Sequence, residues 1–114
     1  MKEYVLIFRM DILTEAAQPG EEQASIYMQQ WMQWLNDISA RGQLASGGNH
    51  LSRNGTVLRK NSRVDRPYTE NNESVAGYIL VLAKNKKDAL AIAEKCPILQ
   101  GDGTSVEIRE TDNP

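Results

Sequence analysis

The segment Ser74–Ala83, which reads SVAGYILVLA, constrains the fold more than any other part of the sequence. It is far shorter than the ~20 apolar residues of a membrane helix, and its β-branched and aromatic residues favour a strand. Side chains on a strand alternate between its two faces, and here both alternating sets are apolar. We therefore predict a central strand covered on both faces, with Gly77 at a close contact or a β-bulge.

A long amphipathic helix is predicted over residues 21–41, with Gly42 as its left-handed C-cap. Met32 and Trp34 are expected to lie off the centre of its apolar stripe and to widen the apolar surface. The extra surface fits two alternatives, a broad core or the cover of a pocket or partner subunit. The stripe itself recurs at spacings of three and four and consists of Ala24, Tyr27, Met28, Trp31, Leu35 and Ile38.

Three further segments are predicted to be sheet strands. Residues 4–8 form a compact apolar run between charged residues. Residues 43–50 read QLASGGNH, and the pair Gly47-Gly48 allows another backbone or a ligand to approach closely. Residues 105–109 alternate between polar and apolar side chains, which predicts a strand with one buried face.

A hairpin and a second helix complete the predicted elements. The dipeptide Asn54-Gly55 is the strongest hairpin signal in the chain and lies between residues 43–50 and the central strand. Asn61 and Ser62 are expected to make another turn, and Val64 to begin a return strand. Asn85 can cap a helix that Pro97 ends, with Asp88 in a capping-box position. A stripe of small residues on that helix permits a tight approach to a sheet: Ala89, Ile92, Ala93 and Cys96.

The order of these elements predicts an α+β, ferredoxin-like βαββαβ fold with an inserted β-hairpin. We expect one domain over residues 1–110 and a flexible C-terminus at residues 111–114. Two helices can cover only one face of the sheet, so the other apolar face needs a partner. A second copy of the chain is the simplest partner, and burial of about 800 Å² per chain is an ordinary dimer interface.

Composition excludes several classes of function. The net charge of −2 shows no basic excess, so we expect no nucleic-acid partner. No apolar run is long enough for a membrane helix and no cleavage pattern follows the N-terminal run, so a cytoplasmic protein is expected. The single cysteine, Cys96, forms no internal disulfide and is expected to be buried. The single histidine is far from the single cysteine in the sequence, so we expect no metal site. The sequence contains no phosphate-binding glycine loop, so we expect no cofactor.

The residues between the hairpin and the central strand are the best candidates for a site. His50 with Asp65 or Glu70 could form a catalytic acid–base pair, since histidine titrates near neutral pH. The alternatives are a surface histidine at a strand end and a turn-forming aspartate before Arg66-Pro67. Carboxylates here could also lie at the mouth of a cleft, or be solvated. The expected ligand-binding residues are Trp31, Tyr68, Glu70 and Tyr78.

Three segments, taken in order, resemble the YCII-related family and, within it, the branch named for an Asp-Gly-Pro-Phe motif. They are DRPY at residues 65–68 with the GYILVLA that follows, GGNHLSRNGTVLR at 47–59, and CPILQGDGTSVEIR at 96–109. Arg66 and Tyr68 replace the glycine and phenylalanine of the motif. The resemblance implies a dimeric α/β barrel, in which two ferredoxin-like sheets pack face to face.

The resemblance leaves three functions open. The first is a homodimer that binds a small organic ligand in a cleft between the sheet and the long helix. The second is a cofactor-free enzyme, because related YCII proteins are suspected of activity through a histidine–aspartate pair. Here the only histidine is His50, and that pair does not map onto it residue by residue. The third is a regulatory or interaction module, since the branch resembles products associated with extracytoplasmic-function sigma factors.

Overall fold

The structure, a computed structural model, describes residues 1–112. Four strands form an antiparallel sheet in the order β2–β5–β1–β6, and two α-helices accompany it. This mixed α+β arrangement is compatible with the predicted ferredoxin-like fold. The sheet strands are β1 Lys2–Met10, β2 Leu44–His50, β5 Ser74–Ala83 and β6 Ser105–Glu110. The remaining elements are α1 Glu21–Ala40, α2 Lys86–Ala93, a hairpin of β3 Val57–Arg59 and β4 Ser62–Val64, and 3₁₀ turns at Glu15–Ala17 and Pro97–Gln100.

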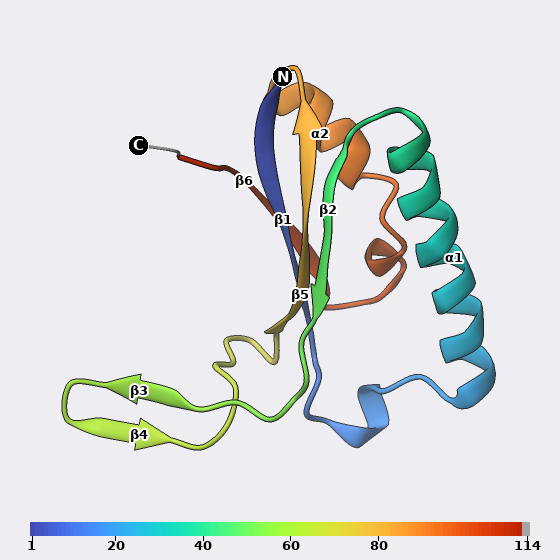
Figure 1. Ribbon diagram of the computed structural model, residues 1–114. Helices are drawn as coiled ribbons and strands as arrows, with labels where there is room; N and C mark the ends of the chain where they lie inside the picture. The colour runs from blue at the N-terminus through green and yellow to red at the C-terminus, as the bar shows by residue number, and fades with distance from the viewer. Residues whose placement is uncertain (113–114) are drawn as a thin grey trace.

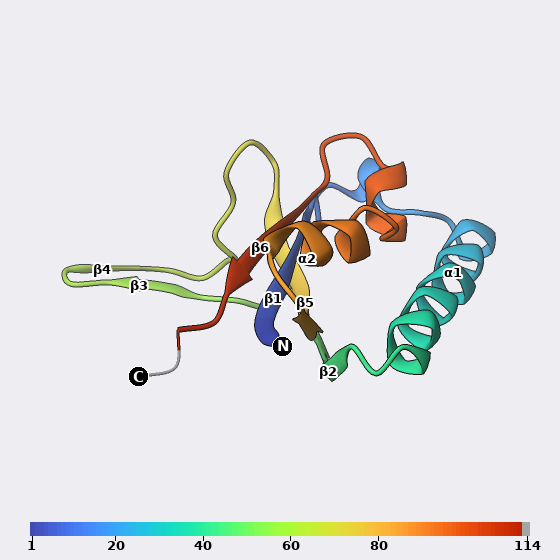
Figure 2. The ribbon, with the colours of Figure 1, turned by 90° about the horizontal axis from the view of Figure 1, so that it is seen from above.

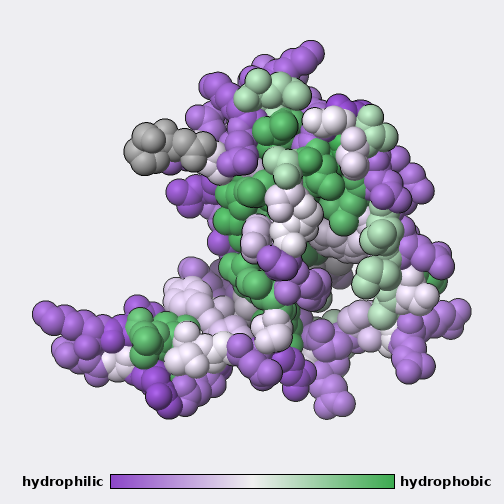
Figure 3. Space-filling view, viewed as in Figure 1, coloured by the Kyte–Doolittle hydropathy of each residue, from purple (hydrophilic) through white to green (hydrophobic). Residues whose placement is uncertain are grey.

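Both helices lie on one side of the sheet, and the β3–β4 hairpin projects on the other side (Figures 1 and 2). Within residues 1–112 no helix covers the second face, as the sequence predicted. That face carries half-buried apolar side chains at the centre of the sheet, and green patches mark hydrophobic residues at the surface over the strands in Figure 3. The register of β1 and β5 places these residues together: Val5, Ile7, Tyr78, Leu80 and Leu82. We call this set the open face.

The core lies between the sheet and the helices. Leu6 and Phe8 of β1 and Val81 of β5 are buried beneath Trp34 and the residues that surround it. Trp34 Nε1 donates a hydrogen bond to the backbone oxygen of Ile92 at 3.1 Å, which joins α1 to α2. Small residues let α2 approach the sheet closely, and all of its core members were predicted: Ala89, Ile92 and Ala93.

The predicted cap of α2 is confirmed. Asn85 Oδ1 accepts a hydrogen bond from the Asp88 backbone N–H at 2.9 Å. Asp88 Oδ2 in turn accepts from the backbone N–H of Lys84 at 2.9 Å, one residue earlier than an ideal capping box. Cys96 follows the helix and is buried, as expected, and burial raises the pKa of its thiol to about 12.

The apolar stripe predicted on α1 was wrong at Ala24, Met28 and Trp34. Trp34, expected at the edge, is only 4% exposed, whereas Met28, expected in the centre, is 63% exposed. The residues that contact the core follow the spacing i, i+3, i+4 and i+7 from Trp31, so only the C-terminal half of α1 is held against the sheet. Residues 21–26 are all exposed. The predicted C-cap is confirmed, because Gly42 adopts a φ of 70°.

The hairpin turn predicted at Asn54-Gly55 was wrong, whereas the turn expected at Asn61-Ser62 lies one residue from the observed one. Val57 pairs with Val64 and Arg59 with Ser62, so Lys60-Asn61 forms the two-residue turn and Asn54-Gly55 does not. Gly55 instead packs beside Pro67, where an added Cβ would lie 3.2 Å from the Pro67 Cα. The Asn-Gly pair therefore serves the base of the hairpin, because a packing contact of the chain overrides its local turn preference.

Glycines bring β2 and β5 unusually close, as the sequence predicted. Gly48 adopts a φ of 59°, and an added Cβ there would lie 1.8 Å from the backbone oxygen of Tyr78. On the facing strand, an added Cβ at Gly77 would lie 2.8 Å from the backbone oxygen of Asn49. A register shift between Phe8 and Arg9 opposite Gly77 marks the predicted irregularity in the β1–β5 ladder.

The C-terminal residues continue from β6. The backbone N–H of Thr111 donates to the backbone oxygen of Glu3 at 3.0 Å. The last two residues of the predicted flexible segment, 113–114, lie outside the described residues, so that prediction is untested for them. Among residues 1–112, neither α-helix has the length and apolarity required to cross a bilayer.

Candidate functional site

A tight turn places two carboxylates side by side at the start of β5. Asn71 and Asn72 both adopt left-handed backbone conformations, with φ of 54° and 62°. Glu70 and Glu73 exchange backbone hydrogen bonds of 3.0 and 2.9 Å across this turn. Two successive left-handed residues are the signature of a type I′ turn, which asparagine tolerates better than most residues. The turn therefore fixes the positions from which both glutamate side chains emerge.

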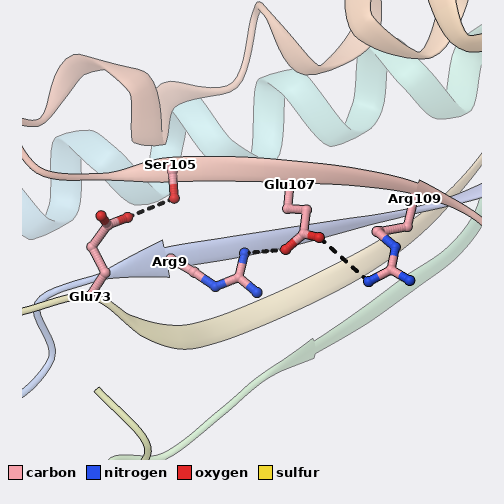
Figure 4. A network of polar contacts seen from close by, with 5 residues as sticks. All are labelled: Arg9, Glu73, Ser105, Glu107 and Arg109. Atoms are coloured by element: carbon pink, nitrogen blue, oxygen red, sulfur yellow. Dashed lines mark hydrogen bonds and ion pairs between the residues drawn. The ribbon is translucent and has the colours of Figure 1, made fainter. Parts of the chain in front are cut away.

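The ends of β1 and β6 bring further polar groups to the same place. Arg9 pairs with Ser105 in the sheet register, and both side chains lie on the side of the sheet away from the helices (Figure 4). Ser105 Oγ donates a hydrogen bond to Glu73 Oε1 at 2.6 Å. Beside it, the hydroxyls of Thr69 and buried Ser74 lie 2.8 Å apart, which ties the incoming loop to β5.

An arginine pair surrounds Glu107 on the open side of the sheet. Arg9 Nη1 lies 2.6 Å from Glu107 Oε1, and Arg109 Nη1 lies 3.5 Å from Glu107 Oε2 (Figure 4). The hydrogen bond from Arg9, with the positive charges of both arginines, lowers the pKa of Glu107 below its ordinary value. Glu107 thus stays ionised and holds the Arg9 guanidinium at one wall of the site.

These groups line a cleft of about 360 Å³ at one end of the open face. This volume falls within the range of small-molecule sites. Its walls carry charged groups, namely two carboxylates and a guanidinium, and three neutral polar groups. Two apolar residues, a valine and a proline, complete them. The lining residues are Arg9, Pro67, Tyr68, Glu70, Asn71, Glu73, Val75 and Ser105. We call this the Glu73 cleft.

A larger hollow of about 630 Å³ lies between α1 and Lys95. Its walls are mainly the polar side chains of one helix, including Gln29, Gln30 and Gln33. The indole N–H of Trp34, which borders it, is already bonded to Ile92. We favour the smaller Glu73 cleft as the candidate site, because several elements converge there and carry complementary charges.

The predicted ligand-binding residues separate into three places. Tyr68 and Glu70 line the Glu73 cleft. Trp31 lies on the opposite side of the sheet, where its ring meets Phe8 edge to face at 4.8 Å between centroids. Tyr78 lies on the open face, and its hydroxyl accepts a hydrogen bond from the Asn49 amide at 3.1 Å. Aromatic rings of Phe8, Trp31 and Trp34 fill the space between sheet and α1 at this level.

The two predicted catalytic residues are placed on different elements. His50 ends β2, opposite Gly77. Asp65 accepts a hydrogen bond from Thr56 Oγ1 at 3.4 Å and pairs with Arg63 at 3.0 Å. Within residues 1–112, no hydrogen bond or ion pair joins His50 to Asp65 or Glu70. The acid–base pair therefore stays a prediction, and the contacts of Asp65 match its alternative as a structural residue near the turn. In the same part of the chain, no group of three or more His, Cys, Asp or Glu side chains is arranged to hold a metal ion.

Sequence reasoning missed Arg9 and Ser105, and it did not connect Glu73 to them. A usable signal was present, because Arg9 ends an apolar strand and Ser105 begins an alternating one. Antiparallel neighbours place the end of one strand beside the start of the other. The order of strands in the sheet was needed to see that these two ends meet.

Comparison with known proteins supports the resemblance seen in the sequence. Among the curated proteins, none matches this chain. Residues 6–112 match the family model of the YCII-related domain, a span that begins in β1 and includes all other elements of the fold. The protein therefore belongs to the YCII-related domain family.

Proposed function

We propose that this protein is a homodimer that binds a small organic molecule in the Glu73 cleft. The observation that carries the proposal is the convergence of Arg9, Tyr68, Glu70, Glu73 and Ser105 on one cleft at the end of the open face. Cleft residues come from β1, from the loop before β5, from β5 itself and from β6. A site assembled from several elements holds its polar groups in a defined arrangement, which small-molecule recognition needs.

The charges of the cleft favour a ligand that donates hydrogen bonds. Glu70 and Glu73 provide carboxylate oxygens, which only accept hydrogen bonds when ionised. Arg9, the cationic group, is already paired with Glu107. Tyr68 is more than half exposed and offers a ring face beside Val75. We therefore infer a ligand with an amine or hydroxyl group for the carboxylates and an apolar or flat part for Tyr68.

The open face supports the homodimer. Its central side chains are apolar, while Arg9, Glu107 and Arg109 lie toward the β6 edge. A second copy seated on this face would produce the dimeric α/β barrel that resemblance to the Asp-Gly-Pro-Phe branch implies. The Glu73 cleft lies at the end of the same face, so the partner would also shelter the ligand from water. Burial of roughly 800 Å² per chain would suffice for a specific interface.

The experiment is a thermal-shift screen of purified protein against a panel of primary amines, polyols and aromatic alcohols. A compound that binds only the folded state raises the melting temperature, by an amount set by its concentration relative to its dissociation constant. We expect hits among donor-bearing compounds and none among the corresponding carboxylic acids. Calorimetric titration of a hit then gives its affinity for the wild-type protein and for variants.

Glu73→Gln should weaken binding of a hit at least tenfold, because it replaces a charged acceptor by a neutral amide. Gln33→Ala is the matched control, since Gln33 lines the hollow beside α1 and is not a lining residue of the Glu73 cleft. Equal affinity of wild type and Glu73→Gln for every hit would refute the assignment of the cleft. A wild-type protein that sediments as a monomer at about 50 micromolar would refute the homodimer.

A further inference from the structure

The β3–β4 hairpin extends from the body of the protein on the side of the open face (Figures 1 and 2). Leu58 is 72% exposed and Val64 is 45% exposed. Val57 pairs with Val64 across the hairpin, so these two side chains share one of its faces. Figure 3 shows a hydrophobic patch on the projecting hairpin, separated from the rest of the surface. These exposed apolar side chains on a protruding ribbon are available for burial by a partner.

Two contacts join the sides of the hairpin at its base. Thr56 Oγ1 donates a hydrogen bond to Asp65 Oδ1 at 3.4 Å, which links the segments that precede β3 and follow β4. Gly55 packs against the backbone of Pro67, and any larger residue there would crowd the proline. The two sides of the ribbon are therefore held together where it begins.

The hairpin segment carries a charge opposite to that of the remaining chain. Residues 51–66 contain five lysine or arginine side chains and one acidic side chain. The other residues hold eight basic and fourteen acidic side chains. An electropositive ribbon that projects from an electronegative body is complementary to the body of another copy.

We propose that the hairpin is an arm that grips the second copy of the chain in the dimer. This inference rests on the homodimer of the proposed function and adds to it the surface that holds the two chains together. Packed sheets lie ~10 Å apart, whereas the five residues 56–60 span ~16 Å at ~3.3 Å per residue. A copy seated on the open face is therefore overlapped by the arm. Leu58 lies on the face of the ribbon opposite to the Val57–Val64 pair, because successive side chains of a strand alternate. The arm buries Leu58 against the partner, and its cations face the partner's acidic surface.

A basic β-ribbon could also contact the phosphates of a nucleic acid. Two observations favour a protein partner. Valine and leucine side chains stand between the cations of the ribbon, where phosphate contacts would leave them exposed. The net charge of the whole chain is −2, which opposes the approach of a polyanion.

The decisive experiment compares the dimer dissociation constants of wild type, Leu58→Asp and Met28→Asp by sedimentation equilibrium. Leu58 is exposed in the single chain, so its replacement should leave folding intact. In a two-fold dimer the substitution is present in both copies, so we expect the dimer dissociation constant to rise about a hundredfold or more. Met28→Asp is the matched control, because Met28 is also exposed but lies on α1 across the sheet. Its dissociation constant should stay within about threefold of wild type.

Charge provides a second, independent test. The double variant Arg59→Glu with Arg63→Glu should have a larger dimer dissociation constant than wild type at about 50 mM salt. This difference should largely disappear at about 500 mM salt, since salt screens exposed charges. A wild-type dimer whose affinity is unchanged by Leu58→Asp and by the charge reversal would overturn the arm but leave the homodimer intact. A monomeric wild type would overturn both. Tight binding of a short duplex DNA, lost in the charge-reversal variant while dimerisation is unchanged, would also overturn the arm.

Discussion

Replacement of Gly48 by alanine should be among the most destabilising single-methyl additions to this protein. The new Cβ would lie 1.8 Å from the Tyr78 oxygen, whereas real contacts of this kind exceed 3.0 Å. β2 and β5 must therefore separate by more than about 1 Å. Hydrogen bonds between them, ordinarily ~2.9 Å long, would then be too long to form. Alanine is also strained at the φ of 59° found here.

The magnitude follows from these two effects. Loss of two ladder hydrogen bonds beside the contact costs about 2 kcal/mol, and the left-handed conformation costs about 1 kcal/mol for alanine. We expect the free energy of unfolding to fall by about 3 kcal/mol. At a urea m-value of about 1.5 kcal/mol/M this shifts the unfolding midpoint by about 2 M.

The neighbouring glycine supplies the control. An alanine at Gly47 meets nothing within 4 Å, and no left-handed φ is required there. Gly47→Ala should therefore change the free energy of unfolding by less than about 0.5 kcal/mol. Urea unfolding of both variants and the wild type at one protein concentration measures the difference. If the two alanine variants unfold within 0.5 kcal/mol of each other (roughly the reproducibility of such values), the close approach of β2 and β5 is refuted.

Three other predictions follow from buried and paired groups. Cys96 should not react with a thiol reagent at pH 8 until the protein unfolds, because burial raises the pKa of its thiol to about 12; prompt modification of the native protein would contradict this. Trp34→Phe should lower the free energy of unfolding by about 2 kcal/mol, since it leaves the Ile92 oxygen without its indole donor and removes ring volume; calorimetry tests this, with exposed Met32→Leu as control. The pKa of Glu107 is lower in the folded than in the unfolded chain, because Arg9 stabilises the ionised carboxylate. This pairing therefore stabilises the fold at pH values above the ordinary pKa of 4.5. The stabilisation is lost as the pH falls through the lower pKa of the folded chain. Glu107→Gln should therefore destabilise the protein by a few tenths of a kcal/mol at pH 7 and by less at pH 3, and equal losses at both pH values would contradict the pairing.

Much of the fold was readable from the sequence because local chemistry specifies it. The apolar run of β5, the glycine that ends α1 and the Asn85 cap of α2 each act through their own backbone or nearest neighbours. The two errors arose where contacts distant in sequence decide the outcome. Asn54-Gly55 does not form the hairpin turn, because Gly55 packs against Pro67 instead. Trp34 is buried in the core because the C-terminal half of α1 contacts both the sheet and α2.

The candidate site shows the same division. Tyr68 and Glu70 could be chosen from the sequence, since polar residues beside an apolar strand mark a possible cleft mouth. Arg9 and Ser105 could not, because they are separated by most of the chain and meet only through the pairing of β1 with β6. Trp31 and Tyr78 looked equivalent as aromatic candidates, but the sheet separates them.

The sequence by itself determined which segments form the two helices and the four strands of the main sheet, that both faces of β5 are apolar, and that glycine is required where β2 meets it. These properties depend on side-chain periodicity and backbone freedom, which are local. Only the tertiary structure decided which strand ends meet, and therefore which charges share a cleft. It also decided that the hairpin projects beside the open face, because the direction of a ribbon depends on the path of the chain where it joins the sheet.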